Sequence, residues 1–210
     1  MVAEEWYRTA DWSPAAQEDF ERRLARARSW SRSQYLKIKA LGLPPEHRAD
    51  AQRLWQRAID CAEFEIDRWH SIECLAASLK EEDPARAEAL FRQLIHEDPD
   101  LNGTSGMAHI DLAELLLATP GESALAEARA LLNAWWAEQR SPFPASRYRY
   151  FVCRLKLAIA SGDHLAARDL AAQALEAAGA QSPFARHRNV GLAHAEADEL
   201  QWLEGWVNPA

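Results

Sequence analysis

The sequence predicts an all-α protein, and three observations support this fold class. The chain has 210 residues, of which 48% are hydrophobic, so it can bury a substantial core. Only 8 Gly and 10 Pro are present, while Ala, Leu, Glu and Arg, which favour helices, dominate. A pattern of small, large and small residues also recurs four times at helical spacing. We therefore expect stacked helices within a single domain, residues 1–210.

The recurring pattern starts with an alanine in each of its four copies. The leading alanines are 36, 41 and 39 residues apart, and each copy follows another helix-like stretch. The four copies are Ala51, Trp55 and Ala58; Ala87, Phe91 and Leu94; Ala128, Leu132 and Trp135; and Ala167, Ala171 and Ala174. Such a period predicts an α-solenoid of about four helical hairpins, spanning residues 34–180.

An N-terminal helix is expected within residues 13–33, ahead of the hairpins. Ser13 can cap it and Pro14 suits its first position. Residues 29–33 interrupt the apolar pattern, so we expect a second helix only from Gln34 to Leu41. A third helix carries the first copy of the alanine pattern.

The remaining elements follow from alternating helical patterns and turn signals. Hairpins are expected at residues 65–96, 110–135 and 145–178, with turns at 81–84, 119–123 and 161–163. The final segment, residues 181–210, begins with Ser182-Pro183 and should cap the array with a helix at about 195–206, since an end repeat must cover its exposed apolar face.

One stretch, residues 65–100, carries a family resemblance. Leu75, Ala76 and Leu79 match first-helix packing positions, and the second helix has Ala87 and Phe91 followed by Pro99. This pattern resembles the tetratricopeptide repeat (TPR), a helix-turn-helix unit of about 34 residues. The resemblance implies a TPR-like helical repeat protein, in which the first helices line a concave surface that binds peptides or partner proteins. The other units are more degenerate.

The charge distribution bears on possible partners. The net charge is −8, and residues 61–140 carry 6 Lys and Arg against 16 Asp and Glu. Phosphate binding requires clustered cations, so an acidic middle argues against nucleic acid or a membrane surface as partner. It favours another protein or peptide, possibly a basic one, and a homodimer is also possible. The N-terminus lacks the order of a signal peptide and no long apolar run exists, so we expect a cytoplasmic protein.

Candidate binding residues follow from the resemblance. Mapping the repeat pattern onto the chain places six polar residues on the inward face of the first helices: His70, Glu73, Asp111, Glu114, Arg149 and Lys156. Their side chains could select a ligand by hydrogen bonding and charge. The alternative is that they form only the solvated face of amphipathic helices.

The nine tryptophans form a second candidate set. Trp55, Trp69 and Trp135 occupy pattern positions and are expected in the core. Trp202 and Trp206 are i, i+4 neighbours near the C-terminus. They could pack within the cap or form an interface with a second copy or another protein, where tryptophan is enriched.

No catalytic signature is present, so we expect neither an enzyme nor a cofactor. The three cysteines, Cys61, Cys74 and Cys153, suggest small buried hydrophobic residues rather than a disulfide or zinc site. A C-terminal cluster of His187, His194, Glu196 and Asp198 matches no metal-binding spacing and is expected on the surface.

These features predict a non-catalytic protein-interaction module, an adaptor that holds a partner in a concave groove or on its terminal aromatic surfaces. Two alternatives remain. One is an inhibitory protein of the immunity or antitoxin kind, which blocks a partner enzyme. The other is a metal-dependent enzyme built around the C-terminal His, Glu and Asp cluster.

Overall fold

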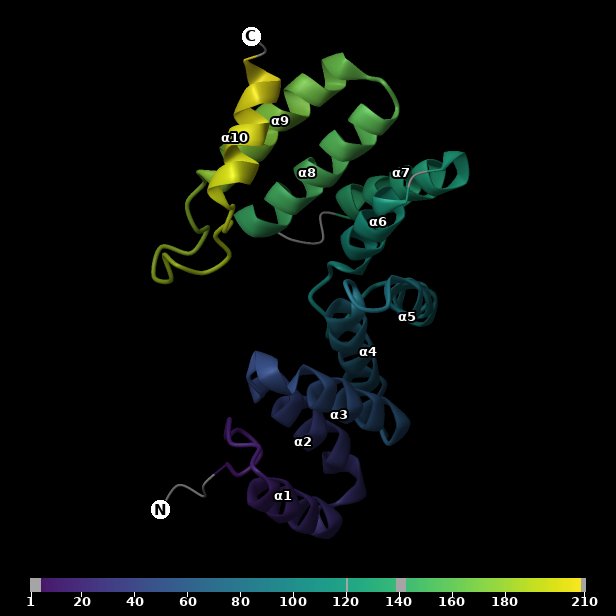
Figure 1. The fold of residues 1–210 in the computed structure, drawn as a ribbon, viewed down its shortest axis with the longest axis vertical. Coiled ribbons are helices and arrows are strands. Elements are labelled where there is room, and N and C mark those ends of the chain that lie inside the picture. The colour runs from purple at the N-terminus through teal and green to yellow at the C-terminus, as the bar shows by residue number, and fades with distance from the viewer. Residues whose placement is uncertain (1–4, 120, 139–142, 209–210) are drawn as a thin grey trace. The chain divides into compact units, whose positions relative to one another are not determined.

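The computed structural model describes residues 5–119, 121–138 and 143–208 (Figure 1). These residues form ten α-helices and one 3₁₀ helix and contain no strand, which confirms the predicted all-α class. Pro120, in the expected turn at 119–123, lies outside the described residues. The chain divides into two compact units, Met1–Ala108 and His109–Ala210, and each is described by itself. The expectation of one domain stays a prediction.

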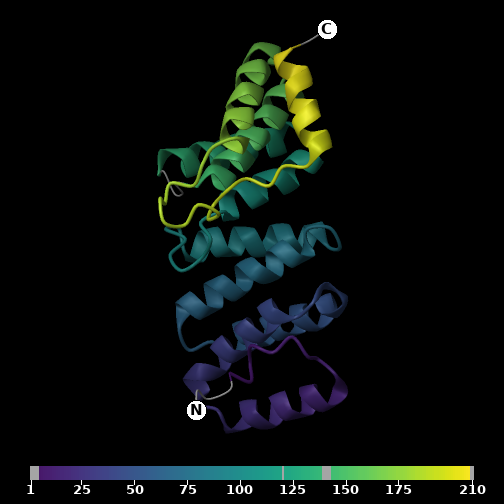
Figure 2. The same cartoon turned by 90° about the vertical axis from the view of Figure 1, so that its left-hand side faces the viewer.

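The first unit contains the helices α1 to α5. Their bounds are α1 Pro14–Arg26, α2 Ser29–Gly42, the 3₁₀ helix η1 Pro45–His47, α3 Arg48–Asp60, α4 Glu65–Leu79 and α5 Pro84–Glu97. Side-chain oxygens cap two of these helices. Ser13 accepts a hydrogen bond from the backbone N–H of Ala16, as expected, and Asp83 accepts one from the backbone N–H of Arg86. From α2 to α5, each helix packs against the next along the chain, as Figure 2 shows.

The alanine pattern accounts for this packing. Ala58, Ala87, Phe91 and Leu94 are completely buried, and Ala51 and Trp55 are buried as well. Polar contacts recur at a sequence separation of 30 residues: Lys37 of α2 with Asp67 of α4, Arg48 of α3 with Ser78 of α4, Gln52 of α3 with Glu82 in the turn after α4, and Gln56 of α3 with Arg86 of α5. These contacts link α2 and α3 to α4, to α5 and to the turn between α4 and α5.

One prediction for this unit is wrong. We expected residues 29–33 to interrupt the helical pattern, but α2 begins at Ser29. The break is shorter because Ala27 and Arg28, both in extended conformation, suffice to turn the chain. The serines are tolerated near the helix start, where Ser33 donates a hydrogen bond to the backbone carbonyl of Ala58, 3.0 Å away.

The N-terminal segment of the first unit is held by Lys39. Its side chain is 1% exposed, and its Nζ donates to the backbone carbonyls of Thr9, at 2.6 Å, and Asp11, at 2.9 Å. The same ammonium lies 5.0 Å from the centre of the Trp12 ring, a cation–π contact. Trp12 in turn packs edge-on against Phe20. Burial lowers the pKa of Lys39, and Asp11 partly offsets this effect.

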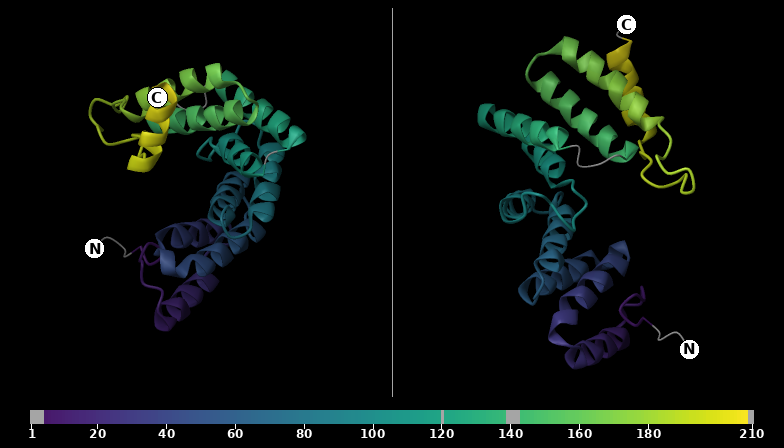
Figure 3. Two further views of the ribbon diagram at one scale, coloured as in Figure 1. Left: turned by 45° about the horizontal axis from the view of Figure 1, so that its top comes forward. Right: turned by 180° about the vertical axis from the view of Figure 1, so that it is seen from behind.

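The second unit contains α6 to α10. Their bounds are α6 Ala108–Ala118, α7 Glu122–Ala137, α8 Pro144–Ala160, α9 His164–Ala178 and α10 Ala197–Val207. α8 and α9 pack against each other and are joined by the predicted turn at 161–163, and α10 packs against α9. The right-hand view of Figure 3 shows α8, α9 and α10 lying side by side. The expected closing helix at 195–206 is thus confirmed as α10.

The core of the second unit also uses the pattern positions. Ala128, Leu132, Ala167, Ala171 and Ala174 are completely buried, and Trp135 is 1% exposed. The Trp135 ring stacks on Tyr150 of α8, with the ring centres 5.3 Å apart. Leu203 fixes α10 in place because it is the residue of that helix that is fully buried.

Candidate functional site

The inward-facing residues predicted on the first helices have different environments. In the first unit, Glu73 is 7% exposed and its carboxylate accepts hydrogen bonds from the backbone N–H of Ser105, at 2.9 Å, and from Ser105 Oγ, at 2.5 Å. A buried carboxylate needs such donors. Glu73 therefore fixes the loop that precedes α6 rather than presenting its charge to solvent.

His70 is half-buried and lies near an ion pair between Lys37 and Asp67 of the same unit. The Lys37 Nζ is 2.6 Å from Asp67 Oδ1. Burial lowers the pKa of His70, and the positive charge of Lys37 lowers it further, against a smaller opposite effect of Asp67. His70 is consequently neutral at physiological pH, where it can donate and accept hydrogen bonds.

In the second unit, three of the predicted residues meet in one cluster. Arg149 of α8 reaches back to α6, where its Nη2 is 2.7 Å from Asp111 Oδ1 and 2.9 Å from Glu114 Oε2. Burial opposes the charge of Arg149, but the two carboxylates outweigh it and raise the pKa of Arg149. Cys153 completes the cluster, with Sγ 3.7 Å from Glu114 Oε1. The ion pairs join α6 to α8, so these charged side chains hold two helices of the unit together.

Lys156 does not join this cluster. It is exposed on α8, three residues beyond Cys153. Of the six polar residues predicted for the concave face, the structure brings together Asp111, Glu114 and Arg149. Glu73 holds a loop, and His70 and Lys156 have separate environments.

The predicted pair of terminal tryptophans lines a groove between α9 and α10, which we call the tryptophan groove. It has a volume of about 570 Å³ and is lined by His164 and Arg168 of α9 and by Gln201, Trp202, Gly205 and Trp206 of α10. The lining is mainly apolar. Trp202 is 36% exposed, and the half-buried Trp206 ring stacks on His164 with ring centres 5.9 Å apart.

Gly205 leaves space in the tryptophan groove, and Arg168 gives the groove a positive charge. A Cβ atom added at Gly205 would meet no described atom within 4 Å, so the glycine borders open space. The exposed Arg168 makes no ion pair or hydrogen bond within the residues that the structure describes. Sequence reasoning missed His164, Arg168 and Gly205. The glycine between two tryptophans in an otherwise strong helix is the signal that could have indicated a groove.

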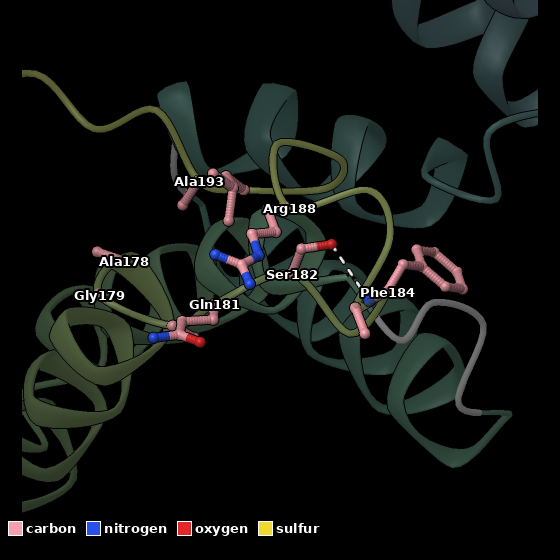
Figure 4. A pocket seen from close by; sticks show the side chains of 10 residues that line it. Ala178, Gly179, Gln181, Ser182, Phe184, Arg188 and Ala193 are labelled. Atoms are coloured by element: carbon pink, nitrogen blue, oxygen red, sulfur yellow. Dashed lines mark hydrogen bonds between the residues drawn. The ribbon is translucent and has the colours of Figure 1, made fainter.

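A second hollow, the loop cavity, has a volume of about 640 Å³ and lies beside the loop between α9 and α10. Figure 4 shows Gln181, Ser182 and Arg188 around it, with the Arg188 guanidinium directed into the cavity. Ala178 and Gly179, at the C-terminal end of α9, form another part of its lining. This cavity could not be predicted from the sequence, because its walls come largely from a loop without helical periodicity.

The residues of the suggested metal cluster are dispersed on the surface. His187, His194, Glu196 and Asp198 are all exposed. Among the described residues, no group of three or more His, Cys, Asp or Glu side chains could hold a metal ion. These four residues therefore do not form a metal-binding group in the described part of the chain.

The three cysteines form no disulfide among the described residues. Cys153 is buried, as expected, whereas Cys61 and Cys74 are only partly buried. Burial raises the pKa of Cys74 to about 12 and also raises that of Cys61, so both thiols are protonated at neutral pH. Protonated thiols are poor nucleophiles.

No protein-family model, curated protein or solved structure matches this chain. Within the described residues, no helix is both long enough and apolar enough to cross a membrane. The function is therefore argued from the geometry of the tryptophan groove and the loop cavity.

Proposed function

We propose that this chain is a TPR-like solenoid that binds a segment of another protein in the tryptophan groove. The solenoid assignment is supported by the order of the helices, which gives four successive pairs from α2 to α9 with α1 before them and α10 after them. The burial of all twelve alanine-pattern residues supports it further. The assignment implies that the protein works by presenting surfaces, not by catalysis.

The observation that carries the binding function is the pair of accessible tryptophan side chains on α10. Large aromatic residues are enriched at the energetic centres of protein interfaces. Trp202 and Trp206 border one groove with a mainly apolar lining, and Gly205 lies between them without a side chain to fill it. A helix interior normally disfavours glycine by about 1 kcal/mol relative to alanine. A glycine at position 205 keeps the groove open for an apolar side chain of the partner, which accounts for this residue.

The charge of the groove defines the partner. Arg168 lines it and makes no ion pair with any described residue, so a partner carboxylate could pair with its guanidinium. We propose that the occupant is an unfolded segment with an aromatic or large aliphatic anchor and a nearby Asp or Glu. The acidic middle of the chain suggested a basic partner, and this stays a prediction. Arg168 in the tryptophan groove favours an acidic segment instead.

Selection of peptides from a random display library tests this function. The wild-type protein should enrich sequences that combine an aromatic or large aliphatic residue with an acidic one. The Trp202→Ala variant should lose this enrichment, and Trp30→Ala, which removes another exposed tryptophan, should keep it. If no motif is enriched, or if the motif survives Trp202→Ala, the proposed function is wrong.

Gly205→Ala separates binding from folding. The added methyl group meets no described atom, so we expect a more stable helix and weaker peptide binding.

The alternative occupant of the groove is a second copy of the chain, and analytical ultracentrifugation tests it by measuring the oligomeric state. A concentration-dependent dimer that disappears in Trp202→Ala would show that a second copy of the chain, rather than a different protein, occupies the groove.

A further inference from the structure

The loop cavity is formed by a segment whose conformation is well defined by hydrogen bonds. Ser182 Oγ donates to the backbone carbonyl of His187, 2.9 Å away, and accepts from the N–H of Phe184, at 3.3 Å. Further along, the N–H of Val190 donates to the His187 carbonyl at 3.0 Å. These bonds fold the segment into successive turns. The cavity is therefore shaped before any ligand arrives.

Contacts with the start of α8 fix the far arm of the loop. The N–H of Ala145 donates to the carbonyl of Gly191 at 2.9 Å, and the rings of Phe143 and Phe184 meet edge to face. Gly191 has a φ of 74°, and a Cβ there would lie 2.1 Å from the Phe143 ring. Only glycine allows this close approach. The loop is thus docked on α8 at a position that its sequence specifies.

The charge within the loop cavity is not neutralised. Residues 179–195 include Arg186 and Arg188 but no Asp or Glu, in a chain whose net charge is −8. The Arg188 guanidinium points into the cavity toward Gln181, as Figure 4 shows. Arg188 makes no hydrogen bond or ion pair with the part of the chain that the structure describes. A guanidinium in this position offers two parallel N–H donors to an incoming carboxylate.

The remaining lining restricts the ligand further. Ala185, Leu192 and Ala193 give the cavity an apolar side, and Phe184 borders it. Ala178 and Gly179 place the C-terminal end of α9 at the cavity, and the carbonyl groups of a helix end repel extra negative charge. Phosphate sites instead use the N–H groups of a helix N-terminus. A ligand with one negative charge and an apolar body fits this lining better than a phosphate does.

We propose that the loop cavity binds a monocarboxylate that carries an apolar group, with Arg188 pairing with the carboxylate. The volume of about 640 Å³ lies in the range of small-molecule sites. The carboxylate could belong to a free acid or to the C-terminus of a peptide. The cavity lies at the opposite end of α9 from the tryptophan groove, so either site can exist without the other.

Amide-shift NMR titration with 3-phenylpropionate tests this proposal on the full chain. The probe should shift resonances of residues 179–193, and Arg188→Gln should weaken its affinity roughly tenfold. Arg186→Gln is the matched control, because Arg186 is on the same loop but does not line the cavity, and it should bind like the wild type. The neutral 3-phenylpropanamide should bind to the wild-type protein no more tightly than 3-phenylpropionate binds to Arg188→Gln.

Two further probes distinguish the source of the carboxylate. A free acid site would prefer 3-phenylpropionate to a short peptide ending in phenylalanine, and a C-terminus site would show the reverse order and lose binding when the peptide is amidated. Equal binding of acid and amide, unchanged affinity in Arg188→Gln, tighter binding of inorganic phosphate, or no shift up to the solubility of the probe would each overturn the proposal. None of these outcomes bears on the tryptophan groove.

Discussion

The two ends of the chain use tryptophan in different ways. At the N-terminal end, Trp12 is 6% exposed and packs against Phe20, with the Lys39 ammonium over its ring. At the C-terminal end, Trp202 is 36% exposed and borders a groove. The difference follows from what surrounds each ring. A buried lysine ties the N-terminal segment over Trp12, whereas α10 presents Trp202 beside a glycine.

The comparison shows which tryptophan stabilises the fold and which is available to a partner. An aromatic ring with protein on all sides contributes its burial to folding. A ring that borders an open groove keeps apolar surface that a ligand can still cover. Burial therefore gives Trp12 a packing role, whereas Trp202 keeps exposed apolar surface at which we propose an interface.

The largest expected effect separates these two roles by stability. Trp12→Ala should lower the free energy of unfolding by about 3 to 5 kcal/mol, because it leaves a cavity in a closed cluster. Trp202→Ala should lower it by about 1 kcal/mol or less, because the ring is partly solvated already. Urea denaturation followed by circular dichroism measures both. Equal losses in the two variants would remove the distinction between the ends.

A smaller effect is expected at Lys39. Lys39→Met keeps the apolar stem but removes the donor to the carbonyls of Thr9 and Asp11, so unfolding should become easier by about 2 kcal/mol. Lys156→Met is the matched control, since Lys156 is exposed, and its stability should stay within about 0.5 kcal/mol of the wild type. A Lys39→Met protein as stable as the control would show that the N-terminal segment is held by its aromatic contacts alone.

The smallest expected effect is a pH dependence at Asp11. Hydrogen bonds from Ser13 lower the pKa of Asp11 below its ordinary value of 3.8, so the folded state binds this proton less readily than the unfolded state does. The carboxylate therefore stabilises the fold above pH 3.8, and this contribution is lost as the pH falls through the lowered pKa. The stability difference between wild type and Asp11→Asn, measured by urea titration, should shrink over this range. A difference that stays constant down to low pH would contradict the assignment.

Most of the fold could be predicted from the sequence, because helix formation depends on local spacing. The alanine pattern identified the buried faces of α3, α5, α7 and α9, and turn residues marked the ends of α8 and α9. The start of α2 was missed because the serines at residues 29–33 suggested a break. A two-residue extended link at Ala27 and Arg28 makes the turn instead, and such a link has no composition signal of its own.

The site could be predicted only in part, because it depends on which helices meet. Trp202 and Trp206 were identified from their spacing, but Arg168 and His164 join them through the packing of α9 on α10. The loop between α9 and α10 has no helical periodicity, so the sequence does not predict which residues of the two helices face each other. Likewise, the sequence indicated that Arg149 could bind a ligand, whereas in the structure it pairs with two carboxylates on α6.

A charge exchange at position 168 tests whether Arg168 pairs with an acidic residue of a peptide bound in the tryptophan groove. The measurement is the affinity of wild type and Arg168→Glu for a selected acidic peptide and for the same peptide with its acid replaced by lysine. Pairing in the groove predicts that Arg168→Glu weakens the acidic peptide by roughly tenfold and that the lysine peptide recovers most of this loss. Equal affinities of both proteins for each peptide, or a loss that the lysine peptide does not recover, would show that Arg168 does not pair with the peptide's acidic residue.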